Sequence, residues 1–145
     1  MPPKAQTYAN HRRYFPLYHF FAVPILLLNV AVAVSDVVRR PGLHTGWAVL
    51  VAVALVALAL AARASTLIVQ NRLIGLEMRL RLTAVLPQEL RPRIGDLTLN
   101  QIIGLRFASD AELPALVERC LAGELRTADA VKKQVRDWRP DLVRA

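Results

Sequence analysis

His19 has the setting in this sequence that most readily suggests chemistry. It stands at the start of an apolar run among five aromatic residues: Tyr14, Phe15, Tyr18, Phe20 and Phe21. A neutral imidazole in such a place can ligate the metal of a haem or chlorin, which makes His19 a candidate cofactor ligand. An aromatic belt at a membrane surface, with the histidine as an interfacial hydrogen-bonding group, accounts for the same residues. We favour the belt, because bulky Phe15 one turn earlier leaves no flat pocket for a macrocycle.

Other residue types that carry chemistry in enzymes lack the partners they need. The sequence has no glycine-rich phosphate loop and no His-Glu-x-x-His motif. Cys120 is the only cysteine, so an internal disulfide and a multi-cysteine metal site are excluded. Ser65 and Ser109 have no plausible histidine or acid partner nearby in sequence, and Ser109 is already expected to cap a helix. His11 and His44 fall in a basic tail and a loop. We therefore predict a non-catalytic protein with no metal site and no bound cofactor.

Two long apolar runs dominate the chain and would position every other element. Residues 20–34 and 46–62 carry no ionised side chain, and a short polar segment separates them. A bilayer core about 30 Å thick needs roughly 20 apolar residues, and both runs reach that length with their uncharged flanks. A cleaved secretory signal is the alternative for the first run, because Ala31, Val32 and Ala33 have the small-x-small pattern of a cleavage site. We favour a retained helix and predict a transmembrane helical hairpin.

Asn29 is the one strongly polar side chain well inside the first apolar run. An amide left unpaired in hydrocarbon is costly, so we expect Asn29 to hydrogen-bond across a helix interface, to the second span or to a partner subunit. Small residues spaced four apart, such as Ala48 and Ala52, would let neighbouring helix backbones approach closely. Asn29 is therefore predicted to be an interface residue.

Basic residues flank both runs and contribute to a net charge of +8. Arg12 and Arg13 precede the first run, and Arg63 and Arg72 follow the second, so the positive-inside tendency places both termini in the cytoplasm. We expect these arginines to contact lipid headgroups. Two arginines in the connecting segment oppose this orientation but are outnumbered. The basic residues near the C-terminus have no accompanying aromatic platform, so nucleic acid is not an expected partner.

The apolar pattern continues past the second run as one uninterrupted helix. Residues 63–86 contain no proline, and two apolar stripes lie on nearly opposite sides of this segment. One stripe consists of Val69, Leu73, Leu76 and Leu80, and the other of Ile74, Met78, Leu82 and Val85. A helix with two apolar sides must be covered twice, by the chain's own later helices and by another chain or the bilayer surface. The pattern leaves the order open, and we assign the partner interface to the stripe that begins at Ile74.

Beyond Pro87 the sequence predicts a bundle of short helices. The signals at the helix ends are two capping boxes, Thr98 with Gln101 and Ser109 with Glu112, the N-cap Thr127 and the C-terminal Gly123. The last helix would carry Val131, Val135 and Trp138 and end before Pro140. The apolar faces of these helices are expected to share one core.

Several segments resemble a known family. Residues 8–14 and, above all, residues 97–114 are similar to an uncharacterised bacterial family of small two-span membrane proteins, and Val131 and Trp138 extend the resemblance over nearly the whole chain. That family is a domain of unknown function without an assigned activity. The resemblance therefore implies the architecture and a bacterial membrane location, and it transfers no mechanism.

The expected fold is all-α, a transmembrane hairpin whose second span extends into a small cytosolic bundle of short helices. The expected parts are a basic tail (1–14), a first span (15–38), a connecting loop (39–46), a second span with its extension (47–86) and a helical domain (87–145). The expected function is an accessory or structural subunit that docks to a larger transport, respiratory or photosynthetic complex in the bacterial inner membrane. Its partners would be lipids and another integral membrane protein or a second copy. The alternative is a membrane-tethered binding or regulatory module, whose helices capture a soluble partner, an anionic lipid or nucleic acid.

Overall fold

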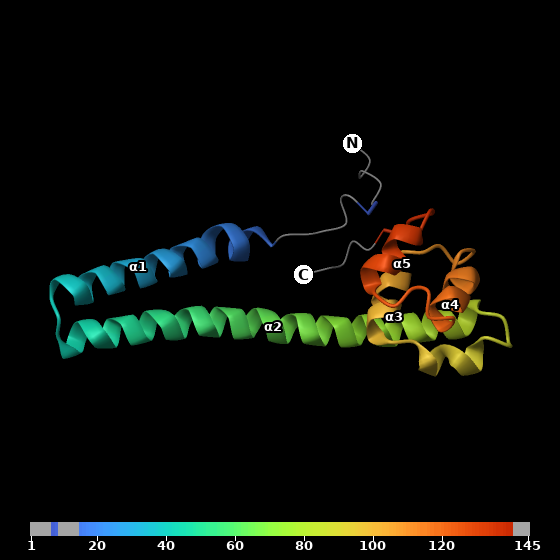
Figure 1. The fold of residues 1–145 in the computed structure, drawn as a ribbon, viewed down its shortest axis with the longest axis horizontal. Helices are drawn as coiled ribbons and strands as arrows, with labels where there is room; N and C mark the ends of the chain where they lie inside the picture. The colour runs from blue at the N-terminus through green and yellow to red at the C-terminus, as the bar shows by residue number, and fades with distance from the viewer. Residues whose placement is uncertain (1–6, 9–14, 141–145) are drawn as a thin grey trace. The chain divides into compact units, whose positions relative to one another are not determined.

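The chain folds into helices. The computed structural model describes residues 7–8 and 15–140, and within these ranges it contains no strand (Figure 1). The elements are, in chain order, η1 (Leu17–Ala22), α1 (Val23–Arg39), α2 (Leu43–Val85), η2 (Arg91–Asp96), α3 (Leu99–Leu105), α4 (Leu113–Leu121) and α5 (Ala128–Gln134). Two compact units are present, which we call the apolar unit (residues 15–68) and the helical domain (residues 69–140 with 7–8). The predicted all-α fold is confirmed.

Two helices are long and apolar enough to cross a membrane. Leu17–Arg39 comprises 23 residues and α2 comprises 43. α2 begins earlier than expected, because the carbonyl of Gly42 accepts hydrogen bonds from the amide of Gly46 (2.9 Å) and the hydroxyl of Thr45 (3.0 Å). This first turn uses the second half of the expected loop, and His44 lies in the helix instead of in a loop.

A proline and small residues shape the apolar unit. Pro24 has no amide hydrogen to donate within the helix, and the chain takes the wider π form in η1 just before it. Near that end the hydroxyl of Tyr18 donates to the carbonyl of Ala59 (3.3 Å). Among residues 15–68, Ala33 and Ala52 are the buried ones, so most of the apolar side chains of this unit face outward.

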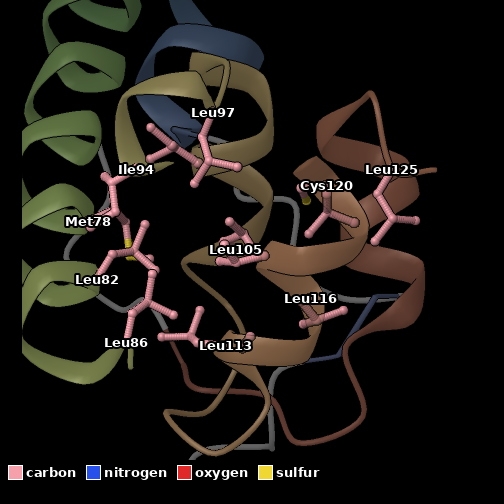
Figure 2. Close-up of a cluster of buried hydrophobic side chains, with 14 of the residues drawn as sticks. Met78, Leu82, Leu86, Ile94, Leu97, Leu105, Leu113, Leu116, Cys120 and Leu125 are labelled. Carbon is pink, nitrogen blue, oxygen red and sulfur yellow. The ribbon is translucent and has the colours of Figure 1, made fainter. Parts of the chain in front are cut away.

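The helical domain has an apolar core that packs against one face of α2 (Figure 2). Four side chains from the end of this long helix and its continuation form one wall: Ile74, Met78, Leu82 and Leu86. The remaining walls come from the shorter helices and their connections, with Ile94, Leu97, Ile102, Leu105, Leu113, Leu116, Val117 and Val131 among them. The shared core expected for the apolar faces of the short helices is therefore present.

Local signals fix the ends of the short helices. The hydroxyl of Thr98 accepts the amide of Gln101 (3.3 Å), and the side-chain oxygen of Gln101 accepts the amide of Thr98 (2.8 Å), which confirms that capping box. Thr127 accepts the amide of Ala130 (3.1 Å), so the predicted cap of α5 is confirmed as well. Gly123 has a φ of 81°, the left-handed conformation expected of the residue that ends α4.

Close packing between α3 and its neighbours depends on two residues that face the interior. A Cβ at Gly104 would lie 2.7 Å from the Cβ of Val131 and 2.9 Å from the carbonyl oxygen of Ala128, so only glycine lets α3 and α5 approach this closely. The buried amide of Gln101 donates to the carbonyls of Cys120 (3.1 Å) and Leu125 (2.9 Å). One side chain therefore caps α3 and also ties it to the end of α4.

Two predictions for the last part of the domain were wrong. Ser109 and Glu112 form no capping box, because the carboxylate of Glu112 instead accepts the amides of Arg136 and Asp137, both at 3.1 Å. These two amides are consequently not used in a helix, and α5 stops before them. Trp138 lies outside the helix, where its residue forms an isolated antiparallel bridge with Ala108.

Candidate interaction surface

The helical domain decides which apolar stripe of α2 is internal. Ile74, Met78 and Leu82 are at most 8% exposed, and Val85 packs against the same core. Our assignment of this stripe to a partner interface was therefore wrong, because the chain's own shorter helices cover it. Both stripes are equally apolar in sequence, so the periodicity gave no means of ranking them.

The opposite face of α2 carries four large aliphatic side chains that nothing in the described chain covers. We call this set the outer stripe: Val69, Leu73, Leu76 and Leu80. Their exposed fractions are 66%, 53%, 58% and 66%. At about 100° per residue, the four positions fall within about 60° of one another around the helix. Contiguous exposed apolar surface of this kind marks contact sites, so the outer stripe is the candidate interaction surface.

Charged residues border the outer stripe, with opposite signs on its two sides. Arg72 and Arg79 lie along one edge and Glu77 along the other, each about 70–90° from the middle of the stripe. All three are exposed, and none forms an ion pair with any residue that the structure describes. Sequence reasoning missed Glu77, although its position beside the stripe was visible in the helical periodicity. An apolar strip with a charged rim has the anatomy of a protein–protein contact.

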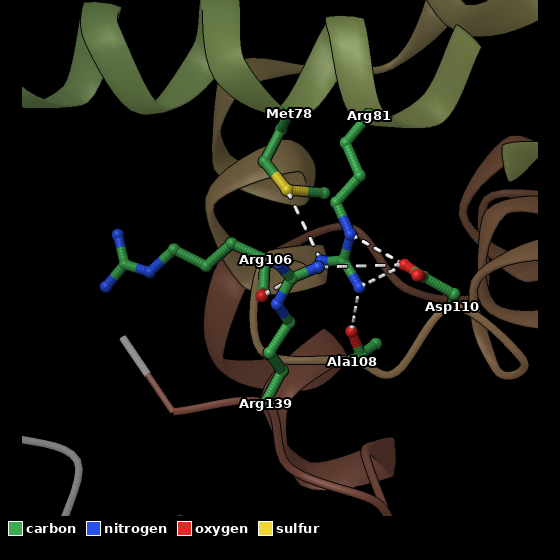
Figure 3. Close-up of polar contacts among 6 residues, drawn as sticks. All are labelled: Met78, Arg81, Arg106, Ala108, Asp110 and Arg139. Atoms are coloured by element: carbon green, nitrogen blue, oxygen red, sulfur yellow. Dashed lines mark hydrogen bonds and ion pairs between the residues drawn. The ribbon is translucent and has the colours of Figure 1, made fainter. Parts of the chain in front are cut away.

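A polar clamp fixes the orientation of α2 in the helical domain (Figure 3). Arg81 donates to the carbonyls of Ala108 (2.7 Å) and Arg106 (3.3 Å), and its guanidinium lies 2.6 Å from the carboxylate of Asp110. Arg139 approaches the same carboxylate at 3.8 Å. With the core on one face and this clamp beside it, α2 is held so that the outer stripe points away from the domain.

The basic residues of α5 are engaged within the helical domain. The ammonium of Lys132 lies 5.6 Å from the centre of the buried Phe107 ring, a cation–π distance. Lys133 pairs with Asp129 at 3.1 Å, and the hydroxyl of Tyr8 donates to the same carboxylate at 2.7 Å. That hydrogen bond, with the help of Lys133, lowers the pKa of Asp129. These contacts give α5 a structural part in the domain.

His19, the candidate cofactor ligand, and Cys120, the single cysteine, are each described by their own surroundings. The Nδ1 atom of His19 lies 3.0 Å from the carbonyl of Phe15, and its ring meets Tyr18 edge-on with 5.1 Å between centroids. In the described part of the chain, no three His, Cys, Asp or Glu side chains gather to hold a metal ion. Cys120 is buried, and burial raises the pKa of its thiol to about 11.

Asn29 lies on the exposed surface of α1 and forms no side-chain hydrogen bond with the described residues. Within a single chain, Asn29 therefore does not hydrogen-bond to the second apolar helix, which was one of the two partners expected for it. A partner subunit stays as the prediction for this amide.

The arginines expected at lipid headgroups are only partly described. Arg63 is half-buried, with its guanidinium 5.9 Å from the centre of the Tyr18 ring, and Arg72 is exposed beside the outer stripe. Arg12 and Arg13 lie outside the described residues. Contact of the two described arginines with lipid stays a prediction.

Comparison with known proteins places the chain in a family. The model of a family described as "Family of unknown function (DUF6526)" matches residues 1–145, the whole chain. The chain belongs to this family, and the resemblance seen in residues 8–14 and 97–114 is confirmed at the level of the family itself. No curated protein and no solved structure matches the chain.

Proposed function

We propose that this member of the DUF6526 family is a non-catalytic integral membrane protein, an accessory or structural subunit that joins a membrane assembly through the outer stripe. The observation that carries the proposal is the division of α2 into two apolar faces, one buried in the helical domain and one exposed. A helix that served only to support its own domain would need one apolar face. The second face is explained by a contact with another chain.

The membrane location is part of the same proposal. Both apolar helices are long enough to span a bilayer, and their outward-facing leucines, valines and phenylalanines match a lipid environment. The arginines after the second apolar run favour a cytoplasmic position for the helical domain, and the proposed topology has both termini in the cytoplasm of a bacterium, at the inner membrane.

The expected strength of the contact follows from the size of the outer stripe. Full burial of one Val or Leu side chain stabilises a contact by about 1.5–3 kcal/mol. The four residues are about half to two-thirds exposed, so a partner that covers them gains a large part of that value at each position. The association must also overcome the loss of translational and rotational freedom, which a shared membrane reduces.

Paired substitutions on the two faces of α2 test the proposal. Leu73→Ser with Leu76→Ser should leave helicity and the unfolding temperature nearly unchanged but release co-purifying chains after gentle detergent extraction. The matched control, Met78→Ser with Leu82→Ser, should unfold the helical domain, because it removes one wall of the core.

Two results would count against the accessory-subunit proposal. If the Leu73/Leu76 variant unfolds like the control, the outer stripe belongs to an internal core and the proposal fails. If the chain instead retains a soluble partner that leaves at high salt and is unaffected by the outer-stripe variant, the tethered binding module replaces it.

A further inference from the structure

The outer stripe has the spacing of a coiled-coil seam. Val69, Leu73, Leu76 and Leu80 follow one another at intervals of four, three and four residues, which is the a/d pattern of a heptad repeat. With Leu73 and Leu80 at a positions, Val69 and Leu76 take d positions. The b, c and f positions between Val69 and Leu80 are Asn71, Ile74, Gly75 and Met78, and they are buried or half-buried on the domain side. The helix therefore offers to a partner the surface that a two-stranded seam uses.

We propose that the partner of the outer stripe is a second copy of this chain, paired with the first in parallel along residues 69–80. The inference rests on the proposed function, because it uses the same surface and names what covers it. A two-fold axis parallel to α2 would bring each a and d side chain against its counterpart in the second copy.

The charges beside the outer stripe select this partner and this direction. In the heptad, Arg72 and Arg79 occupy g positions and Glu77 occupies an e position. A parallel pair places each g residue beside the e residue five positions later in the other copy, so Arg72 of each copy meets Glu77 of the other. An antiparallel pair places g beside g, which brings arginine against arginine. The sequence thus favours the parallel pair at both edges of the seam.

Arg72 and Glu77 do not form an ion pair with each other within one chain. Arg72 and Glu77 lie on opposite sides of the outer stripe, and neither has an ion-pair partner among the described residues. The clamp at Arg81 uses Asp110 and leaves Glu77 unengaged. A second copy supplies the missing partner for both charges at once.

Insertion in a shared membrane allows this short seam to hold two copies together. Copies inserted with the same orientation carry their α2 helices in parallel, which is the direction that the charges favour. The helix is already formed in each copy and continues into the apolar run, so pairing orders few additional residues. Confinement to one membrane raises the effective concentration of one copy near another.

A charge-reversal cycle in the full-length protein, reconstituted in lipid nanodiscs or mild detergent, tests the inference. Glu77→Arg and Arg72→Glu should each weaken dimerisation about tenfold, because each replaces two attractions with two repulsions. The double variant R72E/E77R restores opposite charges and should recover the affinity to within about threefold. Copy number is read by analytical ultracentrifugation or mass photometry, and circular dichroism confirms that each variant is folded.

Cysteine cross-linking supplies an independent measurement. In a Cys120→Ala background, Leu76→Cys should form a disulfide-linked dimer in native membranes under mild oxidation, because a d position faces its own counterpart. The matched control is Gln88→Cys, which is exposed but lies beyond the seam. Preferential cross-linking at position 76 supports the inference, and equal cross-linking at both positions contradicts it.

The outcomes separate this inference from the proposed function. If all charge variants stay monomeric and the Leu73/Leu76 variant loses a different membrane protein, the second-copy inference fails and the accessory role stands. If neither copy number nor any co-purifying chain responds to changes in the outer stripe, both fail. Loss of dimer in the single variants with recovery in the double variant establishes the parallel pair.

Discussion

Arg81 and Asp110, which are 29 residues apart in sequence, meet at 2.6 Å beside the core of the helical domain. The two side chains differ in burial, because 15% of the Arg81 side chain and 59% of the Asp110 side chain is exposed. Because the carboxylate is exposed to solvent, the ion pair itself contributes little to the stability of the domain. The two backbone carbonyls that accept from Arg81 are the more important partners.

Substitution of the two residues should therefore have unequal effects. Arg81→Met leaves the carbonyls of Arg106 and Ala108 without their donor and should lower the free energy of unfolding by about 2–3 kcal/mol. Asp110→Asn should cost less than about 1 kcal/mol. Arg79→Met, on the exposed side of the same helix, is the control and should be nearly neutral. Denaturant unfolding in detergent measures all three, and equal losses for Arg81→Met and Asp110→Asn would contradict this assignment.

Alanine substitutions at two helical glycines should have opposite effects. At Gly104 the new Cβ meets the backbone oxygen of Ala128 at 2.9 Å, so α3 and α5 must move apart, at a cost of about 1–3 kcal/mol. At Gly75 it meets the end of the flexible, partly exposed Leu99 side chain, also at 2.9 Å. Leu99 can rotate away, and the gain in helix propensity should make Gly75→Ala neutral or stabilising. Thermal unfolding compares them, and a stabilised Gly104→Ala variant would refute the close approach.

The thiol of Cys120 should resist alkylation in the native protein. Burial raises its pKa to about 11 from an ordinary value of 9, so at pH 9 the unfolded thiol is substantially ionised and the native thiol is not. Because the native thiol holds its proton to a higher pH than the unfolded thiol, its contribution to the free energy of unfolding is complete below pH 9 and is lost as the pH rises toward 11. Iodoacetamide labelling with and without denaturant measures the first effect. The pH dependence of unfolding, wild type against Cys120→Ala, measures the second, and identical slopes would argue against it.

The proposed topology makes a prediction for intact cells. In a Cys120→Ala background, a cysteine at His44 should react with a membrane-impermeant maleimide, and a cysteine at Thr83 should react only after the cells are opened. Both positions are exposed in the structure, so access to the reagent is set by the membrane. The reverse labelling pattern would place the helical domain outside the cytoplasm and remove the basis for docking there.

Replacement of Asn29 by leucine should affect membrane insertion of the protein and its association with a partner in different ways. The variant should insert into membranes at least as well as the wild type, because leucine is favoured in hydrocarbon. Its association with a partner subunit should weaken by about 0.5–2 kcal/mol, measured from complex yield and thermal stability in detergent. Unchanged yield and stability would mean that the amide faces lipid headgroups or water instead of a partner.

Features that depend on neighbours in sequence were predictable from the sequence. The apolar runs, the Thr98 capping box, the Thr127 cap and Gly123 each require only a pattern within a few residues. The second capping box failed because Glu112 has a stronger use for its carboxylate at two amides more than twenty residues away. No local pattern announces such a partner.

The candidate surface was predictable only as a pair of alternatives. Two stripes on one helix were visible in the spacing, yet the choice between them depends on which face the later helices cover. The clamp at Arg81 was missed for the same reason, since its acceptors are backbone carbonyls of a turn whose position no side-chain pattern encodes.

The wall that α2 contributes to the core has a consequence for how the protein can be divided. The expected boundary at residue 87 would cut away Ile74, Met78, Leu82 and Leu86, whereas the helical domain itself begins at Val69, inside a helix. At this crossing α2 runs from one unit into the other without a break, so the chain cannot be divided there by cutting at a loop. A fragment that starts at residue 69 keeps these four core side chains, and one that starts at residue 87 loses them.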